Sequence, residues 1–210
     1  MITSSLQKVF LYNENNQDTA RIGRLLNDYD LQTFNTENIY QLMRYAREVN
    51  PNLMIFNMDN DEIPDEQALQ YIKAKIDHEI YPVVIVKSDG SLFQMRPEVA
   101  HYVHMPAERE KLVDIIDSYC LGRRTHDVLL LQNYTARAGR LKQQREEGGY
   151  SLFEVHNSDA ARMYLSKNKP RIVCVEYAPQ FILARHTLHH ERIFYVDRDQ
   201  DITEMEKFLV

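Results

Sequence analysis

Residues 19–25 read TARIGRL, and residues 135–141 read TARAGRL. The two heptapeptides agree at six of seven positions and lie 116 residues apart. Each follows a short apolar run, which reads VFLY at 9–12 and VLLL at 128–131. A strand-like segment followed by the same helical segment, twice in one chain, indicates an internal repeat. The sequence therefore predicts two copies of one design.

The first copy alternates short apolar runs with segments of helical spacing. Strands are expected at 9–12, 31–34, 53–56, 82–86 and 101–106, and helices at 22–29, 37–49, 65–76 and 108–119. Pro51 stops the second of these helices, because proline lacks the N–H that a helix interior needs. Continuous apolar strands separated by helices are typical of a parallel sheet covered on both faces. We therefore expect an α/β fold.

The second copy repeats this order and then stops early. Strands are expected at 128–131, 151–155, 172–175 and 192–196, and Ser158 is expected to cap a helix that runs through Leu165. Pro170 precedes the third strand of this copy as Pro51 does in the first, at an offset of 119. Only DRDQDITEMEKFLV follows the fourth strand, which suffices for one helix. We predict two domains, 1–122 and 123–210, with the second truncated.

Composition and charge limit the class of protein. The chain is 44% hydrophobic and 27% charged, which indicates a globular fold. Residues 1–122 contain 11 Lys/Arg against 19 Asp/Glu (−8), and residues 123–210 contain 14 against 12 (+2). Neither half has the basic surface of a nucleic-acid-binding domain, so no nucleic-acid partner is expected. The opposite signs would help the two halves dock, although solvated faces with no partner are the more ordinary explanation.

Location and redox chemistry follow from what the sequence contains. No apolar run approaches the roughly 20 residues that span a bilayer, and the start lacks a secretory signal pattern. We expect a cytoplasmic protein with no membrane span. Cys120 and Cys174 belong to no CxxC pair, so they indicate neither a metal site nor a redox centre. No Walker loop, GxGxxG, GxSxG or HExxH motif occurs, and we expect no enzyme activity.

A five-stranded βα repeat of this size resembles the response-regulator receiver domain, whose sheet is flavodoxin-like. The resemblance covers residues 8–122 well and 126–210 partially. Receivers place two acidic residues after the first strand to hold Mg²⁺, a phosphoacceptor Asp after the third, Ser or Thr after the fourth, and Lys-Pro after the fifth. The resemblance implies two flavodoxin-like domains with parallel sheets and a site at the carboxyl ends of the strands.

Nearly every reactive group of that pattern is replaced in the first copy. The matching positions hold Asn13 and Glu14, Asn57, Lys87 and Ser88, and Met105-Pro106. An Asn amide is neither a nucleophile nor an anion, so Asn57 cannot accept a phosphoryl group. Glu14 beside two carboxamides should hold Mg²⁺ weakly, and we expect no metal or cofactor. Receivers usually hold the Lys-Pro bond cis, which predicts a cis Met105-Pro106 bond.

The second copy places Gln132, Asn133 and Glu176 at the matching positions. Phosphorylation is not expected there either. Glu176 could imitate a permanent negative charge, which matters only if a switch reads it. Alternatively, Glu176 is a strand-end residue that meets solvent or an Arg.

Other side chains leave alternatives open. Asp59 and Asp61 could replace the missing phosphoacceptor or bind a metal, but acidic residues are also ordinary in loops after strands. Lys87 could form an ion pair with Glu14. His186 and His190, with His189 beside them, have the four-residue spacing of a helical zinc site if a third ligand arrives, and are otherwise surface residues.

The repeated helical segment carries an Arg pair in each copy. Arg21 and Arg24, and likewise Arg137 and Arg140, lie three residues apart on one helix surface. Gly23 and Gly139 would permit close packing beside them. The pairs fit either a shared face for a partner or an anion, or a solvated helix face inherited by duplication.

These observations favour a phosphorylation-independent protein–protein interaction or scaffolding module in bacterial signalling, whose partners are signalling proteins. One alternative is an atypical phosphoacceptor that uses Asp59 or Asp61, and another is an effector domain that binds an anionic nucleotide through the Arg pairs. A homodimer is also expected, because a helix at 202–210 would carry an apolar stripe that a truncated domain buries poorly. The stripe consists of Ile202, Met205, Phe208 and Leu209.

Overall fold

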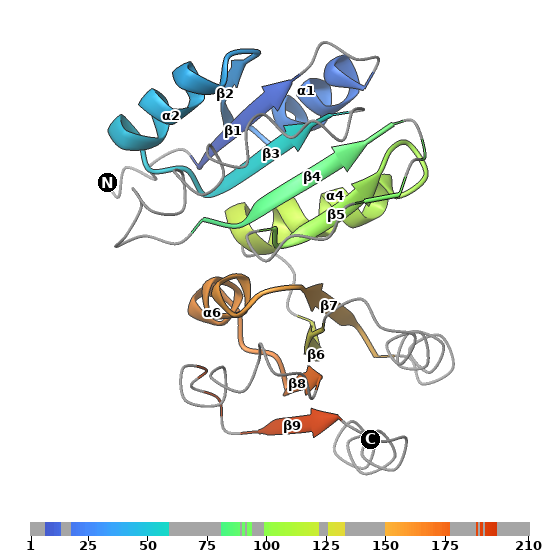
Figure 1. Ribbon diagram of the computed structural model, residues 1–210. Helices are drawn as coiled ribbons and strands as arrows, with labels where there is room; N and C mark the ends of the chain where they lie inside the picture. The colour runs from blue at the N-terminus through green and yellow to red at the C-terminus, as the bar shows by residue number, and fades with distance from the viewer. Residues whose placement is uncertain are drawn as a thin grey trace. The chain divides into compact units, whose positions relative to one another are not determined.

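The computed structural model describes residues 7–13, 18–58, 81–88, 90, 92, 93, 99–121, 126–132, 150–176, 188, 190 and 192–196. The chain divides into two compact units, Met1–Leu121 and Gly122–Val210. These are called the first and second unit below. Each unit contains one parallel β-sheet with helices beside it, which confirms the predicted α/β fold (Figure 1).

The first unit has a five-stranded sheet in the order β2-β1-β3-β4-β5. The strands are β1 (Lys8–Asn13), β2 (Gln32–Thr36), β3 (Leu53–Asn57), β4 (Val83–Lys87) and β5 (His101–His104). Every neighbouring pair is parallel. This strand order is that of flavodoxin-like sheets, which bind ligands outside the carboxyl ends of the strands.

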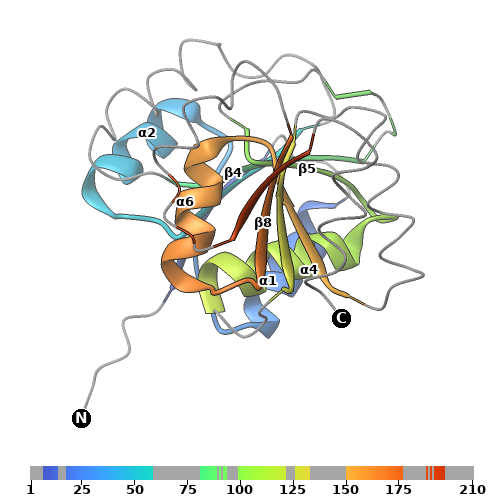
Figure 2. The same ribbon diagram turned by 90° about the horizontal axis from the view of Figure 1, so that it is seen from below.

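Three helices of the first unit are described: α1 (Thr19–Asp28), α2 (Ile39–Glu48) and α4 (Arg109–Ile116). α1 and α4 lie on the same side of the sheet (Figure 2). Asn38 begins α2, because its side chain accepts hydrogen bonds from the first free backbone N–H groups of the helix. α4 continues into a π-helical turn, η1 (Asp117–Leu121), so the last helix extends slightly beyond the predicted end.

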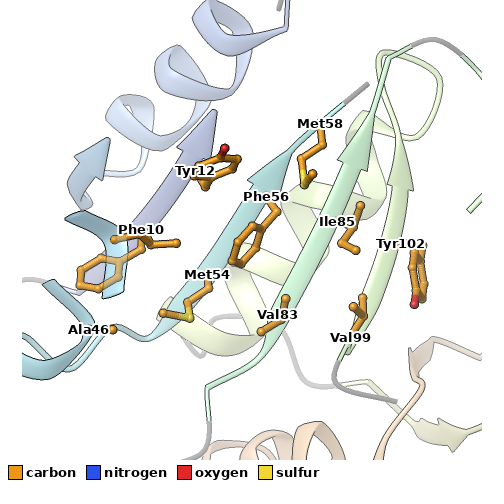
Figure 3. Close-up of a cluster of buried hydrophobic side chains, with 11 residues drawn as sticks. Phe10, Tyr12, Ala46, Met54, Phe56, Met58, Val83, Ile85, Val99 and Tyr102 are labelled. Carbon is orange, nitrogen blue, oxygen red and sulfur yellow. The ribbon is translucent and has the colours of Figure 1, made fainter. Parts of the chain in front are cut away.

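One face of the first sheet carries a large apolar cluster that includes Phe10, Met54, Phe56 and Ile85. These side chains project from alternate positions of the strands, as the two-residue period of a strand requires. Figure 3 shows them on one face of the sheet, with α4 behind the other face. Leu42 of α2 belongs to the same cluster, so α2 covers this face.

The second unit has a four-stranded parallel sheet in the order β7-β6-β8-β9. Its elements are β6 (Val128–Leu131), β7 (Leu152–Val155), α6 (Ser158–Lys167), β8 (Ile172–Glu176) and β9 (Ile193–Val196). This order is that of the first four strands of the first unit. Within the described residues, no fifth strand follows β9.

The register of the two sheets repeats at a fixed offset. Val9 pairs with Leu53, and Val128 pairs with Ile172; 128 minus 9 and 172 minus 53 both equal 119. Helices α2 and α6 have ten residues each, and they also begin 119 residues apart. Insertions outside the strands therefore leave the pairing of the first three strands unchanged.

The aromatic packing between helix and sheet repeats at the same offset. In the first unit Phe34 of β2 packs against Tyr45 of α2, with ring centroids 5.8 Å apart. In the second unit Phe153 of β7 stacks on Tyr164 of α6 at 4.6 Å. An equivalent helix therefore contacts an equivalent strand through the same residue types.

Two local predictions were wrong. Asn157, not Ser158, begins α6: its backbone is extended and its Oδ1 accepts the Ala160 N–H at 2.8 Å, whereas Ser158 is the first helical residue. Asn and Ser are about equally good caps, so composition could not separate them. No described element packs closely against Gly23: apart from its chain neighbours and the backbone of its own helix, a Cβ built on it would meet no described atom within 4 Å.

Several predictions fall outside the described residues. They are the helix at 65–76, the second Arg-bearing helical segment at 135–141 and the apolar stripe within 202–210. The homodimer that rests on this stripe stays a prediction.

Candidate functional site

The carboxyl ends of β1 and β3 meet at two asparagines. Asn13 and Asn57 pair in register across the two strands. Asn57 is 0% exposed and Asn13 is buried beside it. The Asn57 Nδ2 donates a hydrogen bond to the Asn13 Oδ1 at 3.0 Å. The position where the receiver resemblance expects a phosphoacceptor thus holds a buried amide that is bonded to a second amide.

Thr19 completes this arrangement from the start of α1. Its Oγ1 donates to the Asn13 Oδ1, and it also accepts from the Asn57 Nδ2 at 3.4 Å. The Asn13 amide oxygen therefore accepts two hydrogen bonds from within the first unit. The set of Asn13, Thr19 and Asn57 is called the amide pocket below. Sequence reasoning missed Thr19, although Thr begins both copies of the repeated heptapeptide.

The chemistry of the amide pocket is that of a neutral hydrogen-bonded cluster. None of its three side chains is an anion at neutral pH, and none is a nucleophile activated by a neighbouring base. Hard divalent cations prefer carboxylate and water oxygens. The pocket side chains themselves therefore supply neither the nucleophile nor the charge that phosphoryl transfer to a protein requires.

Arg21 and Arg24 differ in what they contact. The Arg21 Nη1 lies 2.7 Å from the Oδ1 of Asp18, whose carboxylate is buried, while the Arg21 side chain is half exposed. Arg24 is exposed, and its Nε donates to the Ala20 carbonyl at 3.2 Å. Arg21 thus compensates a buried charge, which limits its part in any shared anion-binding face. Arg137 and Arg140 lie outside the described residues.

Lys87 lies on the other side of the sheet from Asn57. Strand alternation puts Lys87 on the face of Val83 and Ile85, which belong to the apolar cluster of Figure 3. The Lys87 side chain is buried, its Nζ donates to the Leu92 carbonyl at 3.0 Å, and it lies 5.6 Å from the centre of the Phe93 ring. The ion pair expected with Glu14 involves a residue outside the described part of the chain.

The end of β5 agrees with the sequence prediction. The Met105-Pro106 peptide bond is cis, as predicted, and Met105 is buried. Ser88 follows β4 and is partly buried. Met105 carries no charge where the resemblance expects a lysine.

The second unit has a different set of side chains at the same edge. The Gln132 Nε2 donates to the Glu154 Oε2 at 2.8 Å, and the His156 Nδ1 lies 3.1 Å from the Gln132 carbonyl oxygen. Glu176 ends β8 and is 7% exposed. The structure therefore places acidic and amide side chains on the strands of this edge, whereas the amide pocket of the first unit consists of two amides and a hydroxyl. Sequence reasoning missed Glu154 and His156, because strand order alone brings β7 beside β6.

No protein-family model matches the chain, and no curated protein matches it. Several solved structures are similar to it, and two of them are described here. One is the receiver domain of the sensor histidine kinase PA1611 from Pseudomonas aeruginosa, described with a magnesium ion in its active-site cleft: it is 16% identical, covers 55% of this chain and 98% of its own, and has a TM-score of 0.45.

The other is a periplasmic sugar-binding protein of an ABC sugar transporter from Legionella pneumophila. It is 13% identical, covers 97% of this chain and 86% of its own, and has a TM-score of 0.31.

His190 does not have the environment of a zinc ligand. It lies in neither a helix nor a strand, so the predicted helical spacing from His186 does not hold at this residue. Its Nε2 lies 3.0 Å from the Pro170 carbonyl oxygen, and its Nδ1 accepts the Arg192 N–H at 3.1 Å. Both ring nitrogens are thus engaged with the backbone at the start of β8 and β9. Among the described residues, no group of three His, Cys, Asp or Glu could hold a metal ion.

The two cysteines are buried and free. Burial raises the pKa of the Cys174 thiol to about 12, so this group is protonated at neutral pH.

No helix in the described part of the chain is long and apolar enough to cross a bilayer. Glu14, Asp59, Asp61, Asn133, His186 and His189 lie outside the described residues.

Proposed function

We propose that this chain is a phosphorylation-independent protein-interaction module built from two receiver-like units, of which the second is the shorter. The strand order of the first sheet and the common register of the two sheets support a duplicated flavodoxin-like design. Domains 1–122 and 123–210 are the corresponding halves. A duplicated unit that keeps its fold without catalytic groups is suited to presenting surfaces to other proteins.

The observation that carries the proposal is the amide pocket. A receiver works as a switch because a carboxylate gains and loses a phosphoryl group beside a metal ion. Here the position that the receiver resemblance assigns to the acceptor holds Asn57, which is fully buried and donates a hydrogen bond to Asn13. The first unit is then held in one state by its own hydrogen bonds, and its partners bind independently of phosphoryl chemistry.

The proposal assigns no catalytic residue, cofactor or metal to the chain. It places the protein in the cytoplasm, in bacterial signalling, with signalling proteins as partners, and it includes a homodimer. β9 supports a role in association: Ile193, Phe194 and Tyr195 are each only partly buried, whereas every residue of β4 is buried. A partly exposed apolar strand at a sheet edge is a common site of association.

An atypical phosphoacceptor is the main alternative, because Asp59 and Asp61 follow β3 in the sequence. An effector that binds an anionic nucleotide is less favoured, since Arg21 already compensates the buried Asp18 carboxylate.

Intact-mass spectrometry separates the proposal from the phosphoacceptor alternative. The full chain is incubated with acetyl phosphate and Mg²⁺, beside a receiver domain that has an acceptor Asp as a control for the reagent. We expect the mass of this chain to stay unchanged while the control gains one phosphoryl group. A stoichiometric gain that disappears in Asp59→Asn or Asp61→Asn would establish the alternative instead.

A further inference from the structure

The repeated heptapeptide differs from the rest of the chain in how closely its two copies agree. TARIGRL and TARAGRL share six of seven residues. The neighbouring elements have diverged: β3 and β8 share no residue at the offset of 119, and α2 and α6 share only a tyrosine among ten positions. The heptapeptide was therefore retained after duplication while the elements around it changed.

Four of the six shared residues lie on the solvent side of α1. Thr19 belongs to the amide pocket and Leu25 is buried, so the fold explains these two. The other four have spacings of three and four residues, which put them on one surface of the helix. They are Ala20, Arg21, Gly23 and Arg24, of which Gly23 is half-buried and the others are exposed. This set is called the α1 face below. Exposed residues that are retained in this way indicate binding rather than packing.

Gly23 is retained although the described chain does not require a glycine at this position. Glycine is a poor residue for a helix interior, so alanine would stabilise α1. The Gly23 backbone is not left-handed, since Gly90 is the glycine with positive φ among the described residues. A Cβ at Gly23 would also have open space in front of it. A glycine at such a place instead lets the backbone of another molecule approach closely.

The arginines of the α1 face are retained for a reason other than the ion pair within the first unit. Arg21 pairs with Asp18 through one guanidinium nitrogen, and its side chain stays half exposed. The second copy has Tyr134 at the position of Asp18 and still keeps Arg137. Arg24 forms no ion pair with a described residue, and its described hydrogen bond uses only the Nε atom. The α1 face thus offers guanidinium N–H groups to solvent.

The chemistry that matches this face is a pair of carboxylates on a protein segment. Guanidinium groups bind carboxylates through charge-assisted hydrogen bonds, and Arg21 and Arg24 lie one helical turn apart. Ala20 and Gly23 between them are small, which leaves room for the backbone of the segment that carries the acids. Asp28 is the only acid of α1 and is its last residue. A second copy of this chain is a poor occupant, because a two-fold contact would set arginine against arginine.

We propose that the α1 face binds an acidic segment of a protein partner. Arg24 and the exposed part of Arg21 bind its carboxylates, and Gly23 is the point of closest approach. This inference rests on the proposed interaction function, for which it names a surface and a class of partner.

Photo-cross-linking from the rim of the face identifies its occupant. Asn27 is exposed one turn beyond Gly23, and Asn27→p-benzoylphenylalanine in the full chain places the cross-linker there. Glu48→p-benzoylphenylalanine, on the exposed side of α2, reports unspecific cross-links. Both proteins are irradiated in lysate of the source cells without a phosphodonor. We expect a cross-link from position 27 to another protein, within a segment that has more Asp and Glu than Lys and Arg.

A synthetic peptide with the sequence of that segment then tests the chemistry of the face. Arg24→Glu reverses a charge, and Gly23→Leu fills the point of closest approach. Both are made in the chain with the cross-linker at position 27, so that only binding at α1 is measured. Each should raise the peptide concentration for half-maximal cross-linking at least about tenfold. Arg44→Glu, the same charge reversal on exposed α2, should change it less than about twofold.

Four outcomes would overturn the proposal. They are no cross-link above the control, a cross-link to the second unit or to a second copy of this chain, a partner segment without an excess of acids, and peptide binding that is unchanged in both variants. The phosphodonor experiment measures the mass of the chain alone. A phosphoryl gain there would refute the proposed function without removing a cross-link at α1, so the two failures are distinguishable.

Discussion

Replacing Asn57 by Asp should destabilise the first unit by about 3–5 kcal/mol at pH 7, the usual cost of an uncompensated buried charge. Asn57 is fully buried, and its Nδ2 donates to the Asn13 Oδ1 at 3.0 Å. A carboxylate has no hydrogen to donate, so two oxygens would face each other where a hydrogen bond now exists. The substitution replaces only the side-chain NH2 group by an oxygen. Altered packing should therefore contribute little to the loss of stability.

The pH dependence of this variant follows from the same burial. A buried carboxyl has a higher pKa in the folded state than the value of about 3.9 in the unfolded chain. Below the unfolded pKa the group is neutral in both states, so the electrostatic penalty is absent. As the pH rises, the unfolded state ionises first and the folded state loses relative stability, until the pH passes the raised folded pKa. The penalty should therefore be smaller at pH 4 than at pH 7.

Urea unfolding followed by circular dichroism at both pH values measures the difference. Asn35→Asp is the matched control, because Asn35 is exposed on β2 and the chemical change is identical. The control should lie within about 0.5 kcal/mol of the wild type, as surface substitutions usually do. If Asn57→Asp were as stable as Asn35→Asp at pH 7, the amide pocket would not be the closed neutral cluster described above.

Replacing Tyr164 by Phe should destabilise the second unit by about 2 kcal/mol. The Tyr164 Oη accepts the His126 backbone N–H at 3.1 Å and lies 3.1 Å from the His126 Nδ1. Both residues are buried, and burial raises the pKa of Tyr164 to about 12, so the hydroxyl stays neutral at ordinary pH. The hydroxyl joins α6 to the residue that leads into β6, and Phe cannot replace this connection.

The repeat supplies the control for this prediction. Tyr45 occupies the equivalent place in the first unit. Within the described residues, its Oη accepts one hydrogen bond, from the Gln41 Nε2 at 2.8 Å, and this bond is exposed to solvent. Tyr45→Phe should therefore cost about 0.5 kcal/mol or less. Hydrogen–deuterium exchange resolved by peptide reports each unit separately. Equal loss of protection in the two variants would contradict the role given to the Tyr164 hydroxyl.

Much of the fold could be predicted because it depends on local patterns. Apolar runs such as LMIF at 53–56 and IVCV at 172–175, each preceded by a proline, mark buried parallel strands whatever their partners. The offset of 119 between these runs is also the offset between the registers of the two sheets.

The site could be predicted only in part, because its bonds depend on tertiary placement. The positions of Asn13 and Asn57 followed from the ends of their strands, but the hydroxyl of Thr19 enters the pocket only once α1 is packed. The direction of Lys87 depends on strand alternation relative to Asn57, which requires the register of β3 and β4. The Gln132 Oε1 is buried and has no hydrogen-bond partner among the described residues. This depends on what surrounds it in the fold, so no sequence pattern predicts it.

The central claim is that the chain binds protein partners without phosphoryl chemistry. Partner capture with quantitative mass spectrometry tests it most directly, with the tagged full chain as bait in lysate of the source cells. One sample contains acetyl phosphate and Mg²⁺, and the other contains EDTA and no phosphodonor. We predict the same partners in the same amounts in both samples. Partners that are retained only with the phosphodonor, or no specific partner in either sample, would contradict the claim.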